Sequence, residues 1–330
     1  MYADRIDAYR QIEQARGSKL LVFATSNRDG VPTQIASDIL PFFTEHLDVI
    51  SYAEKISLLL ITNGGDTMTA WNLVNLIKSF CSNFEVIVPF NCFSAGTLIC
   101  LGANNIVMTK QATLGPIDPS TNGPLNPIIP GTNLKVPVSV EFVNAYIEMA
   151  RKEFQIHDQA EMAKIMLKLT DCIHPLVLGQ VYRSRNQIQM VARKLISSQN
   201  LDHETEEKII KFLCSDSGSH DYAIHRREAR EELGLNIETP TQELYNTIKH
   251  IYKNISQEME LEMPFRPDTL LGTNPHVDYE CRRILIESVG NGTDVYVTKG
   301  RLENASFGAP GAGARKIVNN INEEKWNHEN

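Results

Sequence analysis

Several features that would assign a class of protein at once are absent from this 330-residue chain. Its six cysteines form neither a Cys-X-X-Cys pair nor a zinc-ligand spacing, so we expect reduced thiols and no metal. Neither GxGxxG nor a GxxxxGK phosphate-binding loop occurs. The formal net charge is −8, from 32 Lys and Arg against 40 Asp and Glu, which argues against binding to a phosphate backbone. We therefore expect no cofactor and no nucleic-acid partner.

Long hydrophobic runs are also missing. The most apolar segment, residues 86–108, is interrupted by proline, glycine and asparagine, so we expect no membrane span. Residues 1–17 are polar and helix-like, and they lack the apolar stretch that a signal peptide needs. Together with the reduced thiols, these features predict a cytoplasmic location.

What the sequence does contain is a pair of strand-to-helix junctions about thirty residues apart. A strand predicted over residues 57–63 ends in Asn63-Gly64-Gly65, and a helix begins at once. A second strand, over 84–90, leads through Asn91-Cys92-Phe93 to Ser94-Ala95-Gly96, where another helix begins. Small residues at such junctions allow backbone N–H groups to face outward, and one junction presents a serine. This is how a chain can place a nucleophile beside an oxyanion hole.

Each junction has a simpler explanation when it is taken alone. The Gly-Gly pair can be a tight turn in which Asp66 or Thr67 caps the next helix, and Ser94 can be an ordinary N-cap serine. Nor does Ser94 lie in the GxSxG elbow of α/β-hydrolases, because Cys92 stands where the first glycine should be. The two junctions favour a catalytic interpretation only as a pair.

The order of predicted elements indicates an α/β fold with a largely parallel sheet, because strands and helices alternate as far as residue 109. Residues 115–138 are rich in proline, glycine and asparagine and predict a long surface loop. Helices follow as far as about residue 261, and 282–303 predict a β-hairpin around Gly290-Asn291-Gly292. The Gly-, Asn- and charge-rich residues 305–330 predict a mobile tail.

The motifs NGGDxxTA, FSAGT and TLGPIDPS, taken in this order, resemble the ClpP/crotonase superfamily. More narrowly, the chain resembles the serine dehydrogenase proteinase family, which is related to the peptidase SppA. The resemblance covers residues 18–240, with an N-terminal helix at 1–17 before it and a helix and hairpin extension at 241–304 after it. It implies a ClpP/crotonase-like spiral of ββα units with additional C-terminal helices, a peptide or protein substrate and a homo-oligomer.

The same resemblance implies roles for three residues at the junctions. Ser94 would be the nucleophile, and the N–H groups of Gly65 and Ala95 would be the oxyanion donors. The general base departs from the ClpP pattern. ClpP carries a histidine in the stretch that matches residues 115–119, whereas Asp118 is the sole ionisable residue there in this chain.

Further along the chain, Asp221 has the spacing to Glu228-Ala229 that the ClpP catalytic aspartate has to its own Glu-Ala pair. This resemblance makes Asp221 the third triad member and the adjacent His220 the preferred base. The alternative bases are two lysines, Lys152 and Lys135, since SppA-type enzymes use a lysine, and the helix-start histidine His174. Against Lys152, its neighbours Arg151 and Glu153 look like a solvated helix face.

The sequence thus predicts a serine peptidase that forms an acyl-enzyme on Ser94. Two alternatives stay open. A crotonase-type acyl-CoA hydratase or isomerase would use the same N–H pair with a carboxylate such as Asp118. A catalytically inactive ClpP-like scaffold protein would have kept the fold and lost the base, as the missing histidine allows.

Overall fold

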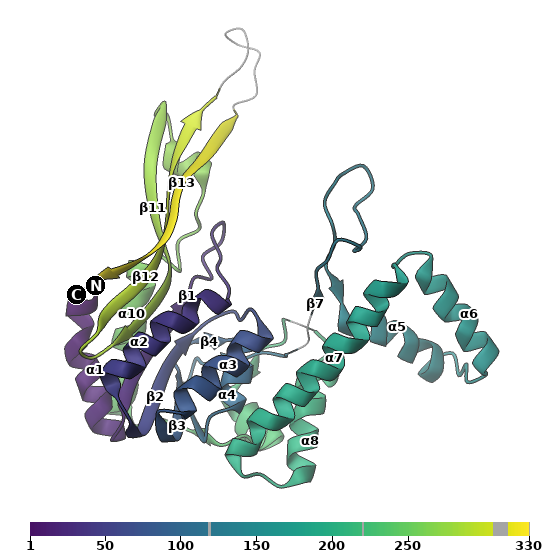
Figure 1. Ribbon diagram of the computed structural model, residues 1–330, viewed down its shortest axis with the longest axis horizontal. Helices are drawn as coiled ribbons and strands as arrows, with labels where there is room; N and C mark the ends of the chain where they lie inside the picture. The colour runs from purple at the N-terminus through teal and green to yellow at the C-terminus, as the bar shows by residue number, and fades with distance from the viewer. Residues whose placement is uncertain (118–119, 220, 306–315, 330) are drawn as a thin grey trace. The chain divides into compact units, whose positions relative to one another are not determined.

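The computed structural model describes residues 1–117, 120–219, 221–305 and 316–329 (Figure 1). The chain forms two compact units. The first consists of Met1–Leu114, Ser198–Asn200 and Ile224–Asn330, and the second of Gly115–Ser197 and Leu201–Ala223. The first unit is therefore assembled from segments far apart in the sequence, and it includes both the N-terminal helix and the C-terminal hairpin.

An eight-stranded sheet lies at the centre of the first unit, in the order β10-β5-β3-β2-β1-β11-β12-β13. Its strands are β1 Lys19–Thr25, β2 Ala53–Ile61, β3 Cys81–Val88, β5 Asn105–Met108, β10 Ile237–Glu238, β11 His276–Ser288, β12 Gly292–Asn304 and β13 Ile317–Glu329. The pairs from β10 to β1 are parallel, and those from β1 to β13 are antiparallel. Residues 20–25 and 56–61 are buried without alternation, as in parallel strands covered on both faces.

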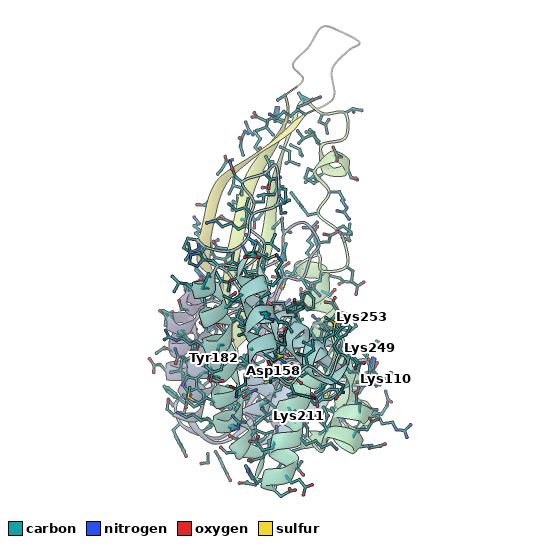
Figure 2. All side chains as sticks on the ribbon, turned by 90° about the vertical axis from the view of Figure 1, so that its right-hand side faces the viewer. Lys110, Asp158, Tyr182, Lys211, Lys249 and Lys253 are labelled. Atoms are coloured by element: carbon teal, nitrogen blue, oxygen red, sulfur yellow. The ribbon has the colours of Figure 1, made fainter. Side chains whose placement is uncertain are left out.

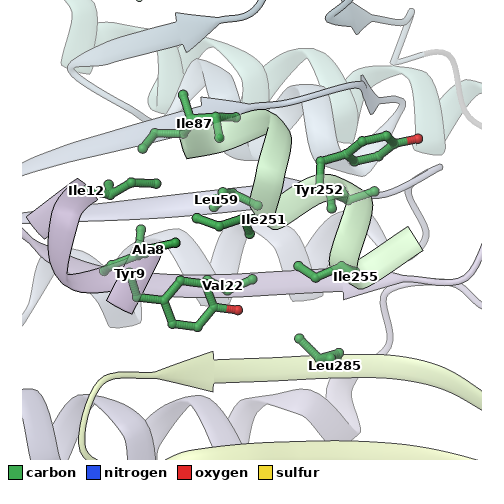
Figure 3. Close-up of a cluster of buried hydrophobic side chains, with 14 of the residues drawn as sticks. Ala8, Tyr9, Ile12, Val22, Leu59, Ile87, Ile251, Tyr252, Ile255 and Leu285 are labelled. Atoms are coloured by element: carbon green, nitrogen blue, oxygen red, sulfur yellow. The ribbon is translucent and has the colours of Figure 1, made fainter. Parts of the chain in front are cut away.

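Helices cover both faces of this sheet. On one face, α1 Tyr2–Arg16 and α10 Gln242–Glu258 bury Ile12 and Ile251 against Val22 and Leu59 of the strands (Figure 3). The other face carries α2 Leu40–Ile50, α3 Thr67–Lys78 and α4 Ala95–Leu101. There the ring of Phe23, one residue after Val22, lies 5.2 Å from the ring of Phe43 of α2. The predicted α/β class is confirmed.

The remaining elements of the first unit are short. They are η1 Ser37–Ile39, β4 Asn91–Cys92, β6 Thr113–Leu114, η2 Ser197–Gln199 (of which Ser198 and Gln199 belong to this unit), β9 Ile224–His225, α9 Arg226–Glu228, η4 Ala229–Leu233 and α11 Pro267–Leu271. The ammonium groups of Lys110 and Lys249, both labelled in Figure 2, lie 4.7 and 5.9 Å from the ring centroid of Tyr245. The contact of Lys110 ties the segment after β5 to α10, and that of Lys249 lies within α10.

The C-terminal residues differ from the prediction of a mobile tail. Residues 317–329 form β13, which pairs with β12 along its whole length. The indole of Trp326 stacks on Phe42 with ring centroids 4.3 Å apart and donates a hydrogen bond to Asp38, 3.0 Å away. The polar composition of these residues predicted a mobile tail, but β13 is stabilised by tertiary contacts rather than by an apolar face of its own. Residues 306–315 lie outside the described residues.

The second unit is mostly helical. Its elements are β7 Ser120–Thr121, β8 Val138–Ser139, α5 Val140–Lys152, α6 Gln159–Thr170, α7 Pro175–Ile196, α8 His203–Lys211 and the π-helical turn η3 Phe212–Asp216. Val140, Val143, Val177 and Val181 form its small core between α5 and α7. The predicted loop over 115–138 leads into the β7–β8 pair, so the proline-rich segment between these strands is a hairpin.

A buried carboxylate links the first helix to the sheet. Glu85 of β3 is fully buried and accepts hydrogen bonds from Arg16, Lys55 and Ser57. Burial alone would raise the pKa of Glu85, but the hydrogen bonds and charges of Arg16 and Lys55 outweigh it and lower this pKa from 4.5 to about 2. The ionised form of Glu85 is therefore held in place by the fold.

We expect Glu85→Gln to lower the free energy of unfolding at pH 7 by about 2 kcal/mol, because the partly buried Lys55 loses its carboxylate partner and the partly buried Arg16 keeps only Glu238. Because folding lowers the pKa of Glu85, its ionised carboxylate stabilises the fold above pH 4.5, the unfolded pKa. This stabilisation is lost as the pH falls toward about 2. Denaturant melts of the variant should thus show a flatter acid limb over this range. The matched control is Glu54→Gln, at an exposed site on β2. Equal acid limbs in the wild type and Glu85→Gln would contradict the prediction.

Candidate active site

The first junction of the candidate site follows β2 and consists of Gly64 and Gly65. Their φ angles are +101° and +148°, values that residues with a side chain rarely adopt. A Cβ atom on Gly64 would lie 2.7 Å from the carbonyl oxygen of Phe93, 2.7 Å from the Cβ of Ser94 and 3.0 Å from the nitrogen of Ala95. The glycine therefore allows the two junctions to touch, which sequence spacing could suggest but not show.

The helix after this turn begins with an N-cap at Asp66, one of the two caps that the sequence suggested. Asp66 caps α3, and its carboxylate accepts hydrogen bonds from the amide and the hydroxyl of Thr69 at 2.6 and 2.7 Å. The cap accounts for the start of the helix. It does not account for the contact between Gly64 and the second junction.

The second junction holds Ser94 in a strained conformation. Its φ and ψ are 52° and −114°, although serine has no special tolerance for a positive φ. Ser94 stands at the N-cap position of α4, yet its side chain makes no capping hydrogen bond, and the residue is partly exposed. Strain of this kind persists only where the surroundings impose it, and it concentrates at functional sites. The hydroxyl is therefore available for chemistry rather than used as a cap.

In the described part of the chain, two backbone amides at these junctions have no hydrogen-bond partner. Within the described ranges, neither the N–H of Gly65 nor that of Ala95 donates a hydrogen bond. The neighbouring amides are engaged: Gly64 donates to the hydroxyl of Thr62 at 3.0 Å, and Gly96 donates to the carbonyl of Phe93 at 2.9 Å. Free N–H groups next to a partly exposed serine can receive the negative oxygen of a tetrahedral intermediate.

The candidate bases come from segments later in the chain than the two junctions. Asp221 is exposed, and its amide donates to the hydroxyl of Ser219 at 3.2 Å. His220 and Asp118 lie outside the described residues. The described candidates Asp221, Lys152, Lys135 and His174 belong to the second compact unit. Ser94, Gly65 and Ala95 belong to the first. The structure brings Ser94 together with the amides of Gly65 and Ala95, and the roles of these residues and of the base stay predictions.

The alternative bases have surroundings of their own. Lys152 is 73% exposed and lies 2.9 Å from Glu148, whose hydrogen bond and charge raise the pKa of Lys152. A lysine base needs the opposite shift, because it must be neutral near pH 7. Lys135 donates to the carbonyl of Pro124 at 2.8 Å, and the Nδ1 of His174 accepts from the amide of Leu176 at 3.2 Å as the cap of α7.

The sequence interpretation overlooked one buried histidine. His46 of α2 is fully buried, with its Nδ1 2.7 Å from the hydroxyl of Ser288 and its Nε2 3.0 Å from the carboxylate of Asp294. All three residues of this Ser–His–Asp contact are at most 1% exposed, so no substrate reaches the hydroxyl. The helical spacing of His46 with Phe43 and Leu47 in α2 would have indicated a core position. We assign these contacts to the packing of α2 on the hairpin.

Within the described residues, no group of three or more His, Cys, Asp or Glu side chains is arranged to hold a metal ion. In the same part of the chain, no helix is long and apolar enough to cross a membrane.

Comparison with known proteins supports a serine peptidase. Residues 2–141, which include both junctions, match the family described as ClpP-like SDH-type serine proteinase. The predicted resemblance to this family is therefore confirmed over that range. The matched range ends within the second compact unit, so the greater part of the helical unit lies beyond it.

Two proteins of Methanocaldococcus jannaschii are similar to the chain over longer ranges. The uncharacterized protein MJ0137 is 28% identical over 201 residues, which are 61% of this chain and 59% of that protein. The uncharacterized protein MJ1495 is 26% identical over 244 residues, 71% of this chain and 72% of that protein. The chain thus spans about six-tenths of the first of these relatives.

Among solved structures, a serine-to-alanine mutant of the 1510-N membrane-bound stomatin-specific protease has a TM-score of 0.40 at 15% identity, covering 68% of this chain and 80% of that one. A probable enoyl-CoA hydratase/isomerase from Mycobacterium abscessus has a TM-score of 0.21 at 8% identity, covering 68% and 81%. These scores are too low to support an inference about substrate or mechanism.

Proposed function

We propose that the protein is a serine peptidase that cleaves peptide bonds through an acyl-enzyme on Ser94. The observation that carries the proposal is the state of Ser94: strained, partly exposed, not used as a helix cap, and in contact with a turn whose next amide is free. Three features of an acyl-transfer site thus come from one small region of the first unit. The match of residues 2–141 to a serine proteinase family supports the same reaction.

The reaction follows from these groups. The Oγ of Ser94 attacks the carbonyl carbon of the peptide as a base takes its proton, and the carbonyl oxygen becomes negative. The N–H groups of Gly65 and Ala95 donate hydrogen bonds to that oxygen. The C–N bond then breaks as the base returns the proton to the leaving amine, and an ester on Ser94 remains. Water attacks the ester, with the same base accepting its proton, and the serine is restored.

For the base we propose His220 oriented by Asp221, with Lys152, Lys135 and His174 as the alternatives. Asp221 keeps the spacing to Glu228-Ala229 that motivates this choice. The raised pKa of Lys152 in its pair with Glu148 supports the histidine over this lysine. A peptide or protein substrate, assembly as a homo-oligomer and a cytoplasmic location belong to the same proposal.

Labelling with a fluorophosphonate probe tests the proposal, because this reagent phosphonylates an activated serine. We expect the wild type to label, with His220→Ala and Asp221→Asn slowed at least about 100-fold and Lys152→Met within about threefold. Lys152→Met is a matched comparison because it removes a charge while keeping an unbranched side chain. If Lys152→Met alone were silent, the lysine would be the base. A folded wild type that never labels would contradict the peptidase proposal and favour a scaffold role.

A further inference from the structure

The side chain of Thr62 contacts both junctions, at Gly64 in the first and at Gly96 in the second. Thr62 directly follows β2 and is fully buried. We propose that Thr62 is a positioning residue that fixes the separation of the two oxyanion donors; the proposal rests on the peptidase function proposed above. It was not among the candidate residues of the sequence, since a threonine at the end of a strand carries no signal of its own.

The backbone of Thr62 joins the first junction to the second. Its N–H donates to the carbonyl of Asn91 at 3.2 Å, and its carbonyl accepts from the N–H of Phe93 at 3.0 Å, which makes a parallel bridge to Cys92. Ser94 follows Phe93 directly. The strand end that leads to the Gly-Gly turn is therefore hydrogen-bonded to the segment that leads to the nucleophile.

The hydroxyl of Thr62 holds the turn itself. Its oxygen accepts the N–H of Gly64 at 3.0 Å and lies 2.7 Å from the hydroxyl of Thr25 on β1. This hydrogen bond occupies the amide of Gly64. Both glycines have positive φ angles, and the next amide, that of Gly65, donates no hydrogen bond within the described residues. The hydroxyl thus decides which of the two glycine amides can serve the oxyanion.

The methyl group of Thr62 sets the position of the second junction. A Cβ atom on Gly96 would lie 2.5 Å from the Cγ2 of Thr62, so the Cα of Gly96 packs directly on this methyl group. Gly96 is the residue after Ala95, whose N–H is the second donor. Backbone, hydroxyl and methyl of one buried residue thereby contact both sides of the oxyanion hole. Both donors must reach the same oxygen at about 2.7–3.1 Å, so a small shift of either one is costly.

Three variants separate positioning from general stability. Thr62→Val keeps the shape but loses the hydroxyl, and Thr62→Ser keeps the hydroxyl. Thr25→Val removes the other hydroxyl of the buried pair but leaves the bond from the Gly64 amide to Thr62. We expect the maximal rate of fluorophosphonate labelling to fall about 10- to 100-fold in Thr62→Val, with the probe concentration at half-maximal rate unchanged. Thr25→Val should stay within about threefold of the wild type. Thr62→Ser keeps the hydroxyl but lacks the methyl group that packs on Gly96, so its rate should lie between those of the wild type and Thr62→Val.

Melting temperatures of the same preparations complete the test. If Thr25→Val and Thr62→Val lose labelling in proportion to their loss of stability, or if Thr62→Val labels like the wild type, the positioning role is overturned while the peptidase function stands. If the folded wild type does not label, both proposals fall. Thr62→Ala replaces Thr62→Val if the latter does not fold, with the same expected loss of rate.

Discussion

Ser94→Ala is expected to abolish fluorophosphonate labelling and to lower peptide hydrolysis by at least about 10⁴-fold. In the proposed reaction the loss follows from the removal of the atom that forms the acyl-enzyme, since the two amides would stabilise an oxyanion but cannot attack a carbonyl. The fold should survive, because the Ser94 side chain makes no capping hydrogen bond and the residue is partly exposed. The melting temperature should therefore stay close to that of the wild type.

The control for this prediction is another serine at a helix end. Ser79 is the C-cap residue of α3, and its hydroxyl donates to the carbonyl of Leu76 at 2.6 Å. Ser79→Ala should label at the wild-type rate. A Ser94→Ala protein that still labels would show that the reactive serine lies elsewhere, and mass spectrometry of the adduct would then identify it.

Gly64→Ala is expected to lower the maximal rate of labelling by about 10²- to 10³-fold and to destabilise the protein. The added Cβ would meet the carbonyl oxygen of Phe93 and the Cβ of Ser94, both at 2.7 Å, so the two junctions would have to separate. That movement displaces Ser94 and the amide of Ala95 from the turn together, and loss of one oxyanion donor alone costs this much in rate. Labelling kinetics and thermal melts measure the two effects.

Gly17→Ala separates the steric effect from backbone strain. Gly17 ends α1 at φ +58°, and a Cβ there would have no atom within 4 Å. This variant should lose about 1 kcal/mol of stability and no labelling. If Gly64→Ala behaved like Gly17→Ala, the contact between the two junctions would not matter for the reaction.

The fold was largely predictable because its signals are local. The strand at β1 has an unbroken apolar run, and the turn at Gly290-Asn291-Gly292 separates two strands that pair as a hairpin, as predicted. Where the prediction failed, the stabilising contacts were distant. The sequence of β13 is mostly polar, and the strand is held by β12 and by contacts such as that of Trp326 with Phe42. Distant partners leave no trace in the local pattern of a strand.

The candidate site divides in the same way. The motifs around Gly65 and Ser94 indicated a nucleophile and two amides, because small residues at a strand-to-helix junction have few other uses in combination. The strain at Ser94, the contact with Gly64 and the role of Thr62 could not be derived from spacing, since each depends on where a second segment lies. His46 was missed for the same reason: its partners are more than 200 residues away.

The sequence by itself determined the α/β class and the two junctions, since strands and helices follow from the periodicity of apolar residues and turns follow from glycine. Only the tertiary structure decided that the junctions touch and which amides are free, because these depend on the pairing of Thr62 with Cys92 and on the occupied amide of Gly64. Periodicity reports which face of an element is buried. It does not report which other element covers that face.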